Sequence, residues 1–294
     1  MELKIVNLSK TYPNGVQALK NVNLTIPKGM FGLLGPNGAG KSTLMRTIAT
    51  LQEADNGEVR LNDIDVLKQK SKVRKRLGYL PQEFGVYPKI SAETMLNHFA
   101  ELKGISNKGE RKDIVKALLE QTNLYHVRNK NISGYSGGMK QRFGIAQALL
   151  GDPNLIIVDE PTAGLDPAER NRFHNLLSEI GENIIVILST HIVDDVSDLC
   201  KKMAIINQGE VLLQGDPSEL IENIEGKIWE KVIEKKELES YQEKFNIISS
   251  RLYLGKIIIH AFGDTNPNSF EPIKPNLEDV YFSSIKNGKK IVNL

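Results

Sequence analysis

The stretch from residue 35 to residue 43 constrains the fold of this chain more than any other. It reads Gly-Pro-Asn-Gly-Ala-Gly-Lys-Ser-Thr and fits the phosphate-loop pattern G-x-x-x-x-G-K-[ST]. An apolar run at residues 30–34 precedes it, and Leu44, Met45 and Ile48 follow it at helical spacing. Such a motif needs a strand, a loop and a helix in this order, so the sequence predicts an α/β domain that binds a nucleoside triphosphate.

The residue types in this stretch explain how it would hold phosphate. Glycines let the backbone wrap closely around an anion, and the N–H groups at the start of the following helix would point at it. Lys41 would reach the terminal phosphates, and the Ser42 hydroxyl would bind Mg²⁺. The alternative, a glycine-rich turn that merely precedes a lysine, does not account for the flanking strand and helix. The candidate nucleotide-binding residues of the loop are Gly35, Pro36, Asn37, Gly38, Ala39, Gly40, Lys41, Ser42 and Thr43.

Charge and cysteine content restrict the setting and the partners. Of 294 residues, 38 are basic and 36 acidic, and this balance argues against a nucleic-acid partner, which would need a basic surface. Cys200 is the only cysteine, so no disulfide can form within the chain and we expect a reducing, cytoplasmic setting. The N-terminus lacks a signal-peptide pattern, and no apolar run approaches the roughly 20 residues that span a bilayer. We therefore do not expect the chain itself to form a channel.

The hydrophobic pattern divides the chain into a large and a small part. Short β-branched runs predict buried strands of an α/β domain over residues 1–222, interrupted by an all-helical insertion over about residues 83–151. Beyond residue 223 a charged stretch, short strand candidates and three prolines predict a small α+β accessory domain over residues 223–294. Strands are expected at residues 3–8, 18–26, 77–81, 155–158, 184–188, 247–248 and 257–259, a hairpin at 204–214 turning at Gln208 and Gly209, and helices at 68–76, 167–180 and, around Cys200, 196–203.

Two adjacent carboxylates end one of the predicted buried strands. Residues 155–158 lead into Asp159 and Glu160, and a parallel strand would carry both to the edge of the sheet where the phosphate loop also lies. There Asp159 would hold Mg²⁺, usually through water, and Glu160 would polarise the attacking water. A purely structural role is the alternative, but leaving two carboxylates unpaired on an apolar strand would be costly.

A serine and two glycines precede another helical pattern. Ser136 would cap a helix whose start, at Gly137 and Gly138, stays open to an anion. Alone, this is an ordinary capped helix. Between a phosphate loop and an Asp-Glu strand, however, Tyr-Ser-Gly-Gly-Met-Lys-Gln-Arg resembles the signature motif of ABC ATPases.

The other marks of that family are present in order. Tyr12 resembles the aromatic residue that stacks on adenine, and Gln82 the glutamine of the Q-loop, which touches Mg²⁺ and water. Gly-Leu-Asp ending at Asp166 resembles the D-loop, and His191 the switch histidine near the γ-phosphate. The remaining histidines match no motif and are expected to be structural: His98, His126, His174 and His260.

The resemblance covers about residues 1–222 and carries expectations about fold and mechanism. It implies a P-loop NTPase fold with a RecA-like core, an antiparallel β subdomain and a helical subdomain. It also implies a head-to-tail dimer in which each signature motif completes the ATP site of the other copy. We expect a homodimer rather than pairing with a related ATPase subunit, because neither site is visibly degenerate. The expected catalytic residues are Glu160, His191, Lys41 and Asp166; ATP contacts beyond the loop are Tyr12, Gln82, Ser136, Gly137 and Gly138; Mg²⁺ ligands are Ser42, Gln82 and Asp159.

A weaker resemblance points to one branch of the family. Met139 and the tail Asn-Leu-Glu-Asp-Val-Tyr at residues 276–281 resemble ATPase subunits of ABC-2 type exporters, although Tyr135 departs from the usual leucine. This implies a separate transmembrane permease, which would keep the chain on the inner face of the cell membrane. A cytoplasmic helix of this permease would contact Phe84, Val86 and Tyr87, unless these residues pack in the core. The rival hypotheses are a soluble ABC ATPase acting on DNA or ribosomes, and a phosphotransferase.

Overall fold

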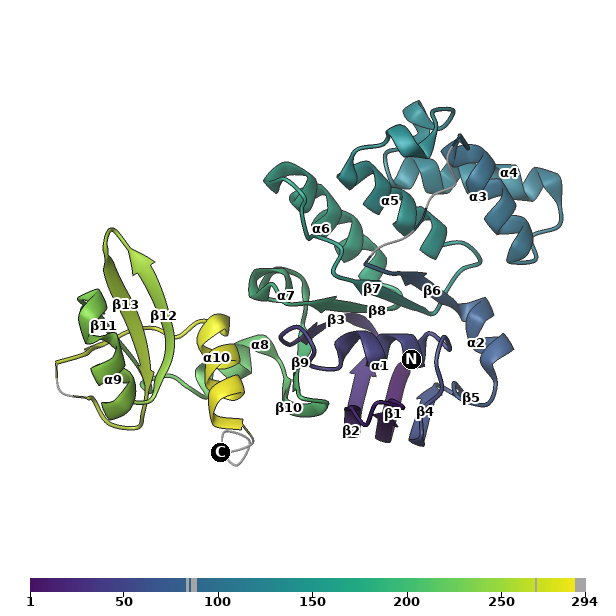
Figure 1. Ribbon diagram of the computed structural model, residues 1–294. Helices are drawn as coiled ribbons and strands as arrows, with labels where there is room; N and C mark the ends of the chain where they lie inside the picture. The colour runs from purple at the N-terminus through teal and green to yellow at the C-terminus, as the bar shows by residue number, and fades with distance from the viewer. Residues whose placement is uncertain (83–84, 86–88, 268, 289–294) are drawn as a thin grey trace.

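A six-stranded sheet forms the centre of the molecule (Figure 1). The computed structural model describes residues 1–82, 85, 89–267 and 269–288. Five strands run parallel, and β10 closes one edge antiparallel to β9. In sheet order the strands are β10 (Glu210–Gly215), β9 (Lys202–Asn207), β3 (Gly29–Leu34), β8 (Ile185–Thr190), β7 (Leu155–Asp159) and β6 (Leu77–Leu80).

The innermost strands are buried on both faces. Every residue of β7 and of β8 is buried, as expected for β-branched runs in a parallel sheet covered on both sides. One face of the sheet packs with α1 (Lys41–Ile48), the other with α6 (Pro167–Gly181) and α7 (Val193–Leu199). Because β3 and β7 end on the same side of the sheet, the phosphate loop and the Asp-Glu pair meet there.

A second sheet covers the face of the core that carries α1. It is antiparallel, with the order β2-β1-β4-β5, and its apolar side chains share one cluster with those of β3 and α1. The predicted strands at residues 3–8 and 18–26 are therefore confirmed, each with a few extra residues. The bounds are β1 (Glu2–Thr11), β2 (Gln17–Pro27), β4 (Asn56–Leu61) and β5 (Ile64–Asp65), followed by helix α2 (Lys70–Arg76).

The predicted helical insertion is present beyond β6. It consists of α3 (Ala92–Leu102), α4 (Lys108–Gln121) and α5 (Gly137–Ala148), with two short 3-10 turns between α4 and α5. These helices have a core of their own, which includes Phe143. Ser91 and Asn107 cap α3 and α4 by accepting hydrogen bonds from backbone N–H groups.

The C-terminal part forms a third, antiparallel sheet, set apart from the other two in Figure 1. The last helix, α10, packs against both this sheet and the helices α7 and α8 of the larger part, residues 1–222. It therefore lies at the joint between the two parts. Helix α8 (Pro217–Glu222) ends the larger part, and the elements of the C-terminal part are β11 (Ile228–Ile233), α9 (Leu238–Lys244), β12 (Ile247–Tyr253), β13 (Lys256–Phe262), β14 (Glu271–Pro272) and α10 (Leu277–Asn287).

One local prediction was wrong. The helix expected over residues 196–203 ends at Leu199, because Cys200 is already extended and β9 begins at Lys202. Cys200 is nonetheless buried, which raises the pKa of its thiol. No strand was predicted in the charged stretch after residue 227, where the structure has β11: its charged residues Glu230 and Lys231 are half-buried and pair with His260 and Ile259 of β13. Across the described residues, no helix combines the length and apolarity needed to cross a membrane.

Candidate functional site

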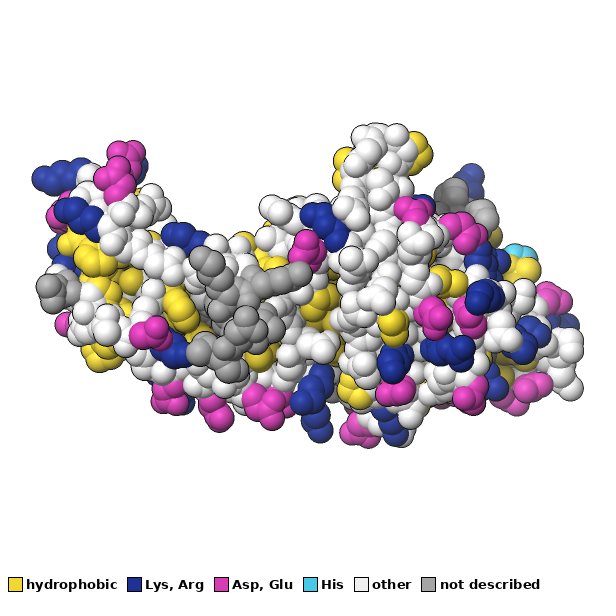
Figure 2. All heavy atoms as spheres, turned by 90° about the horizontal axis from the view of Figure 1, so that it is seen from below, with side chains coloured by type: hydrophobic (Ala, Val, Ile, Leu, Met, Phe, Trp, Pro, Cys, Tyr) yellow, Lys and Arg dark blue, Asp and Glu magenta, His cyan; other side chains and the backbone are white. Residues whose placement is uncertain are grey.

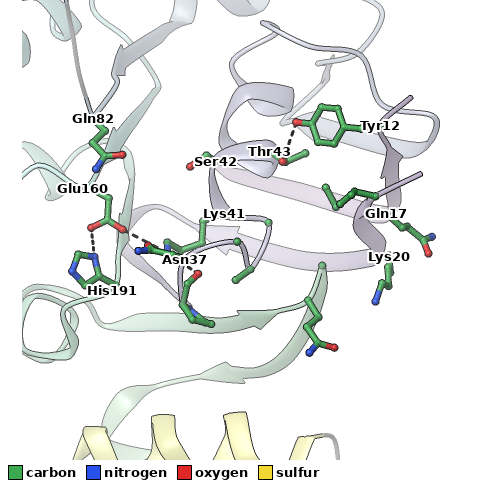
Figure 3. Close-up of a pocket in the computed structure, with 18 residues that line it drawn as sticks. Tyr12, Gln17, Lys20, Asn37, Lys41, Ser42, Thr43, Gln82, Glu160 and His191 are labelled. Carbon is green, nitrogen blue, oxygen red and sulfur yellow. Dashed lines mark hydrogen bonds and ion pairs between the residues drawn. The ribbon is translucent and has the colours of Figure 1, made fainter. Parts of the chain in front are cut away.

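A cavity of about 600 Å³ opens around the phosphate loop (Figure 3). It brings together residues from three separated motifs: the loop itself, Glu160 after β7 and His191 after β8. Gln82, which follows β6, lies on the same side. The predicted residues on the cavity wall are Tyr12, Pro36, Asn37, Gly38, Ala39, Gly40, Lys41, Ser42, Thr43, Gln82, Glu160 and His191.

Close packing explains two glycines of the loop, Gly35 and Gly40. Gly40 has φ 106°, and a Cβ there would lie 2.5 Å from the Ala18 carbonyl oxygen. A Cβ on Gly35 would overlap the Ile206 carbonyl oxygen. Gly40 also begins α1 without a side-chain cap, so the first N–H groups of this helix face the loop and suit an anion.

Lys41 lies inside the loop with its charge directed at the backbone. Its side chain is buried, and Nζ donates to the Gly35 carbonyl at 2.6 Å and to the Pro36 carbonyl at 3.3 Å. The same nitrogen lies 3.5 Å from Glu160 Oε1. The ammonium group and the carboxylate thus form a buried ion pair at the cavity wall.

Glu160 and His191 form a hydrogen-bonded pair. Glu160 Oε2 lies 2.6 Å from His191 Nδ1, and the Glu160 side chain is buried whereas that of His191 is 50% exposed. Glu160 has φ 50°, a left-handed conformation that costs a residue other than glycine about 1 kcal/mol or more. Its N–H donates to the Ser189 carbonyl at 2.8 Å, which holds the turn against β8. The pair presents a carboxylate base and an imidazole to one cavity.

The residues expected to bind Mg²⁺ have suitable chemistry. Asp159 is buried, and its Oδ1 has no hydrogen-bond partner among the described residues, so an electropositive partner would satisfy it. Ser42 and Gln82 line the cavity, whereas Asp159 is not one of its lining residues. One carboxylate with hydroxyl and amide oxygens suits Mg²⁺, which binds few protein ligands together with phosphates and water. The described residues contain no cluster of three or more His, Cys, Asp or Glu side chains placed to hold a metal.

Tyr12 lies at the far end of the cavity. Its hydroxyl lies 3.2 Å from Thr43 Oγ1 and donates to Gln52 Oε1 at 3.1 Å (Figure 3). These bonds anchor the ring beside the start of α1, and stacking on adenine stays a prediction.

The signature and D-loop residues lie outside this cavity. Ser136 caps α5, since its Oγ accepts from Met139 N at 3.2 Å, and Asp166 caps α6 by accepting from Glu169 N at 2.9 Å. Gly138 packs so tightly against Glu169 that a Cβ would overlap its carboxylate. Ser136, Gly137 and Asp166 are exposed. Within one copy, therefore, the structure does not bring these residues to Lys41.

Sequence reasoning missed part of the cavity wall. The missed residues come from the start of β2 and from the β9–β10 turn, which no motif marks. Gly209 illustrates the reason: its N–H donates to the Ala39 carbonyl at 2.9 Å, a contact that the order of the sheet creates. The sequence indicates the hairpin turn at Gln208 and Gly209, but it does not indicate that this turn lies against the phosphate loop. The additional wall residues are Val16, Gln17, Ala18, Lys20, Gln208 and Gly209.

The fold and the cavity define a P-loop nucleotide-binding protein, and the comparisons identify its family. The family described as "ABC transporter" matches residues 19–163. The ABC transporter ATP-binding protein NatA of Bacillus subtilis is 37% identical over 211 residues, 71% of this chain and 85% of NatA. The linearmycin resistance ATP-binding protein LnrL of the same organism is 34% identical, over 76% of this chain and 72% of LnrL. The chain belongs to the ATP-binding proteins of the ABC transporter family and is an ATPase.

Solved structures agree with this assignment. A dimeric post-hydrolysis structure of the ATP-binding cassette MJ0796 bound to ADP and Pi has a TM-score of 0.66 at 28% identity, over 73% of this chain and 98% of that one. The cbiO1 subunit from Clostridium perfringens has a TM-score of 0.69 at 30% identity, over 75% of this chain and 90% of that one. The predicted fold class is thereby confirmed.

Proposed function

We propose that this chain is the ATP-hydrolysing subunit of an ABC exporter and that two copies close head-to-tail around two ATP molecules. The observation that carries this proposal is the separation of the two halves of the site. Lys41, Glu160 and His191 share one cavity, whereas exposed Ser136 opens a different helix outside it. A twofold axis can bring the second half to the first, because each copy supplies both surfaces.

The geometry supports direct roles for the residues within one copy. Lys41 would bind the terminal phosphates in place of its present carbonyl partners. Glu160 would polarise the attacking water, and His191 Nδ1 would orient that carboxylate. Asp159, Ser42 and Gln82 would hold Mg²⁺, which supplies charge neutralisation between the β- and γ-phosphates when bound.

Across the dimer, Ser136, Gly137 and Gly138 would direct the open start of α5 at the γ-phosphate of the partner copy. Asp166 would contact the partner copy next to this helix start. The closed dimer would then depend on the γ-phosphate, and its loss on hydrolysis would release the two copies.

A groove between the core and the helical subdomain suits a membrane partner. It measures about 680 Å³ and lies between α2 and β6 on one wall and α3 and α5 on the other. Leu102 on its rim is 71% exposed, and Arg74 and Lys103 add positive charge. We assign this groove to a cytoplasmic helix of a separate transmembrane permease, which would hold the chain at the inner face of the membrane. Phe84, Val86 and Tyr87, also expected there, lie outside the described residues.

The names of relatives support export. LnrL is named for linearmycin resistance, and YbhF of Escherichia coli, 35% identical over 75% of this chain, as a probable multidrug transporter protein. This chain spans only 38% of YbhF.

Gel filtration with ATP tests the dimer. Glu160→Gln should retain ATP and elute as a dimer, because hydrolysis no longer removes the γ-phosphate. Adding Ser136→Arg should return the protein to a monomer that still binds ATP, since serine acts on the partner's nucleotide. Lys41→Ala should lose nucleotide binding altogether. A Glu160→Gln protein that stays monomeric with ATP, both alone and with its permease, would refute the proposed mechanism.

A further inference from the structure

One carboxylate is completely buried beneath the catalytic pair without touching the cavity. Asp195, on α7, has 0% exposure. Its two oxygens face different parts of the fold. Oδ2 accepts from Thr162 Oγ1 at 2.5 Å and from Thr190 Oγ1 at 3.4 Å. Oδ1 accepts from Arg170 Nε at 2.9 Å and lies 2.9 Å from His174 Nε2.

The two threonines belong to the segments that carry the candidate catalytic residues. Thr162 lies two residues after Glu160, in the segment that follows β7, and Thr190 directly precedes His191, at the end of β8. Thr190 Oγ1 also accepts from the N–H of Ile192 at 3.0 Å, so it braces both sides of His191. Oδ2 of Asp195 thus joins the turns on which Glu160 and His191 lie.

The turn at Glu160 needs such support because of its backbone conformation. Glu160 has φ 50°, and residues with this left-handed backbone persist where their surroundings hold them. Its own N–H is bound to β8 through the Ser189 carbonyl. Beyond Glu160, the bond from Thr162 to Asp195 is the buried contact that holds the chain at its exit from the turn.

Helix α7 is in turn fixed to the strand that leads into the phosphate loop. A Cβ on Gly32, in the middle of β3, would lie 2.6 Å from Val196 Cγ1. Val196 is the neighbour of Asp195 and is itself fully buried. A shift of α7 would therefore displace the catalytic turns relative to Lys41.

We propose that Asp195 is a positioning residue for ATP hydrolysis. Through Thr162 and Thr190 it holds Glu160 and His191 at fixed positions relative to the phosphate loop. The inference rests on the proposed roles of Glu160 and His191, and it adds a buried residue that does not line the cavity. The Oδ1 side, with Arg170 and His174, serves a different purpose, since it ties α7 to α6 and neutralises a buried charge.

The two sides of the carboxylate allow a sharp test in the full-length protein. Thr162→Val and Asp195→Asn should lower kcat about ten- to a hundred-fold, the range expected when a catalytic group is misplaced. Their Kd for ATP should stay within about two-fold of the parent, because the phosphate loop is untouched. Arg170→Met is the matched control: it removes a partner from Oδ1, so it should lower the thermal midpoint and leave kcat within about two-fold.

A double variant separates this inference from the proposed role of Glu160. If Asp195 acts through Glu160, Glu160→Gln combined with Thr162→Val should hydrolyse ATP no more slowly than Glu160→Gln alone. Full hydrolysis by Glu160→Gln would refute the proposed base, whatever Thr162→Val does. Normal kcat in Thr162→Val, Thr190→Val and Asp195→Asn, with only the thermal midpoint lowered, would overturn the positioning role. The threonine variants keep the test decisive if Asp195→Asn fails to fold.

Discussion

Two histidine–carboxylate pairs of the same chemistry lie in different parts of this molecule. In the ATPase part, His191 Nδ1 lies 2.6 Å from Glu160 Oε2. In the C-terminal part, His260 Nδ1 lies 2.7 Å from Asp279 Oδ1. The bonds are almost equal in length, so bond geometry alone does not distinguish the pair proposed to be catalytic from a structural one.

Their surroundings differ. The side chain of His191 is half exposed at a cavity, and its carboxylate partner lies beside Lys41. The side chain of His260 is only 15% exposed, and its second nitrogen is occupied by Glu230 at 3.2 Å. Asp279 also forms a capping box with Asn276 at the start of α10. A pair that faces a cavity is available to a ligand, whereas a pair closed on both sides joins elements of the fold.

The second pair lies at the joint between the two parts of the chain. His260 is on β13 and Glu230 on β11, while α10 carries Asp279 and packs against α7 and α8. The pair therefore ties the C-terminal sheet to a helix seated on the ATPase part. Figure 2 shows from below that the molecule is elongated, with the C-terminal part at one end.

The largest effect expected is on catalysis and should appear at the first pair alone. Glu160→Gln should lower the steady-state ATPase rate about a hundred- to a thousand-fold, since a positioned general base contributes rate factors of that order. The matched control, Asp279→Asn, should retain at least half of the parent rate. Comparable losses of ATPase activity in both variants would break the distinction between a reactive and a structural pair.

The second prediction concerns stability. Asp279→Ala should lower the free energy of unfolding by about 2 kcal/mol, because it removes one half of the capping box and the shared acceptor of the Asn276 N–H and His260 Nδ1. Urea denaturation would measure this. Glu278→Ala, at the exposed neighbouring position, should change the same free energy by less than about 0.5 kcal/mol. If both substitutions cost the same, Asp279 does not hold the joint.

The third prediction concerns pH. The hydrogen bond to Asp279, chiefly, raises the pKa of His260, despite the opposing effect of burial. A raised pKa in the folded state means that the stabilisation is complete below the unfolded pKa, near 6.5. It is lost as pH rises through the higher folded value. The parent protein should therefore lose its stability advantage over His260→Gln between slightly acid and alkaline pH, as measured by thermal midpoints. An advantage that is constant or grows with pH would contradict this.

The smallest effect is expected at the partly exposed end of the second pair. Glu230→Gln should cost about 0.5 kcal/mol or less in the free energy of unfolding, because the Glu230 side chain is 31% exposed and water screens its interaction. Urea titration against Asp279→Ala would rank the two carboxylates. A larger loss at Glu230 than at Asp279 would reverse their assignment.

Much of the site could be predicted because its signals are local. The phosphate loop, the strand ending in Asp159 and Glu160, and the cap at Ser136 each lie within a few consecutive residues, and the structure forms all three as expected. The order of these motifs was sufficient to indicate the family. The wall residues from β2 and the β9–β10 turn escaped prediction, because the pairing of elements distant in the sequence creates their contacts.

By itself, the sequence determined that the chain has a nucleotide-binding α/β core. The spacing of apolar residues and the positions of the glycines are both signals carried by residues close together in the sequence. Tertiary structure alone decided which histidine meets which carboxylate. His191 and Glu160 are brought together because β8 pairs with β7, and His260 reaches Asp279 because α10 folds back toward β13. The same holds for Asp195, whose four partners lie on three separate segments. Burial of that charge is possible only where all of them converge, and no local pattern encodes such convergence.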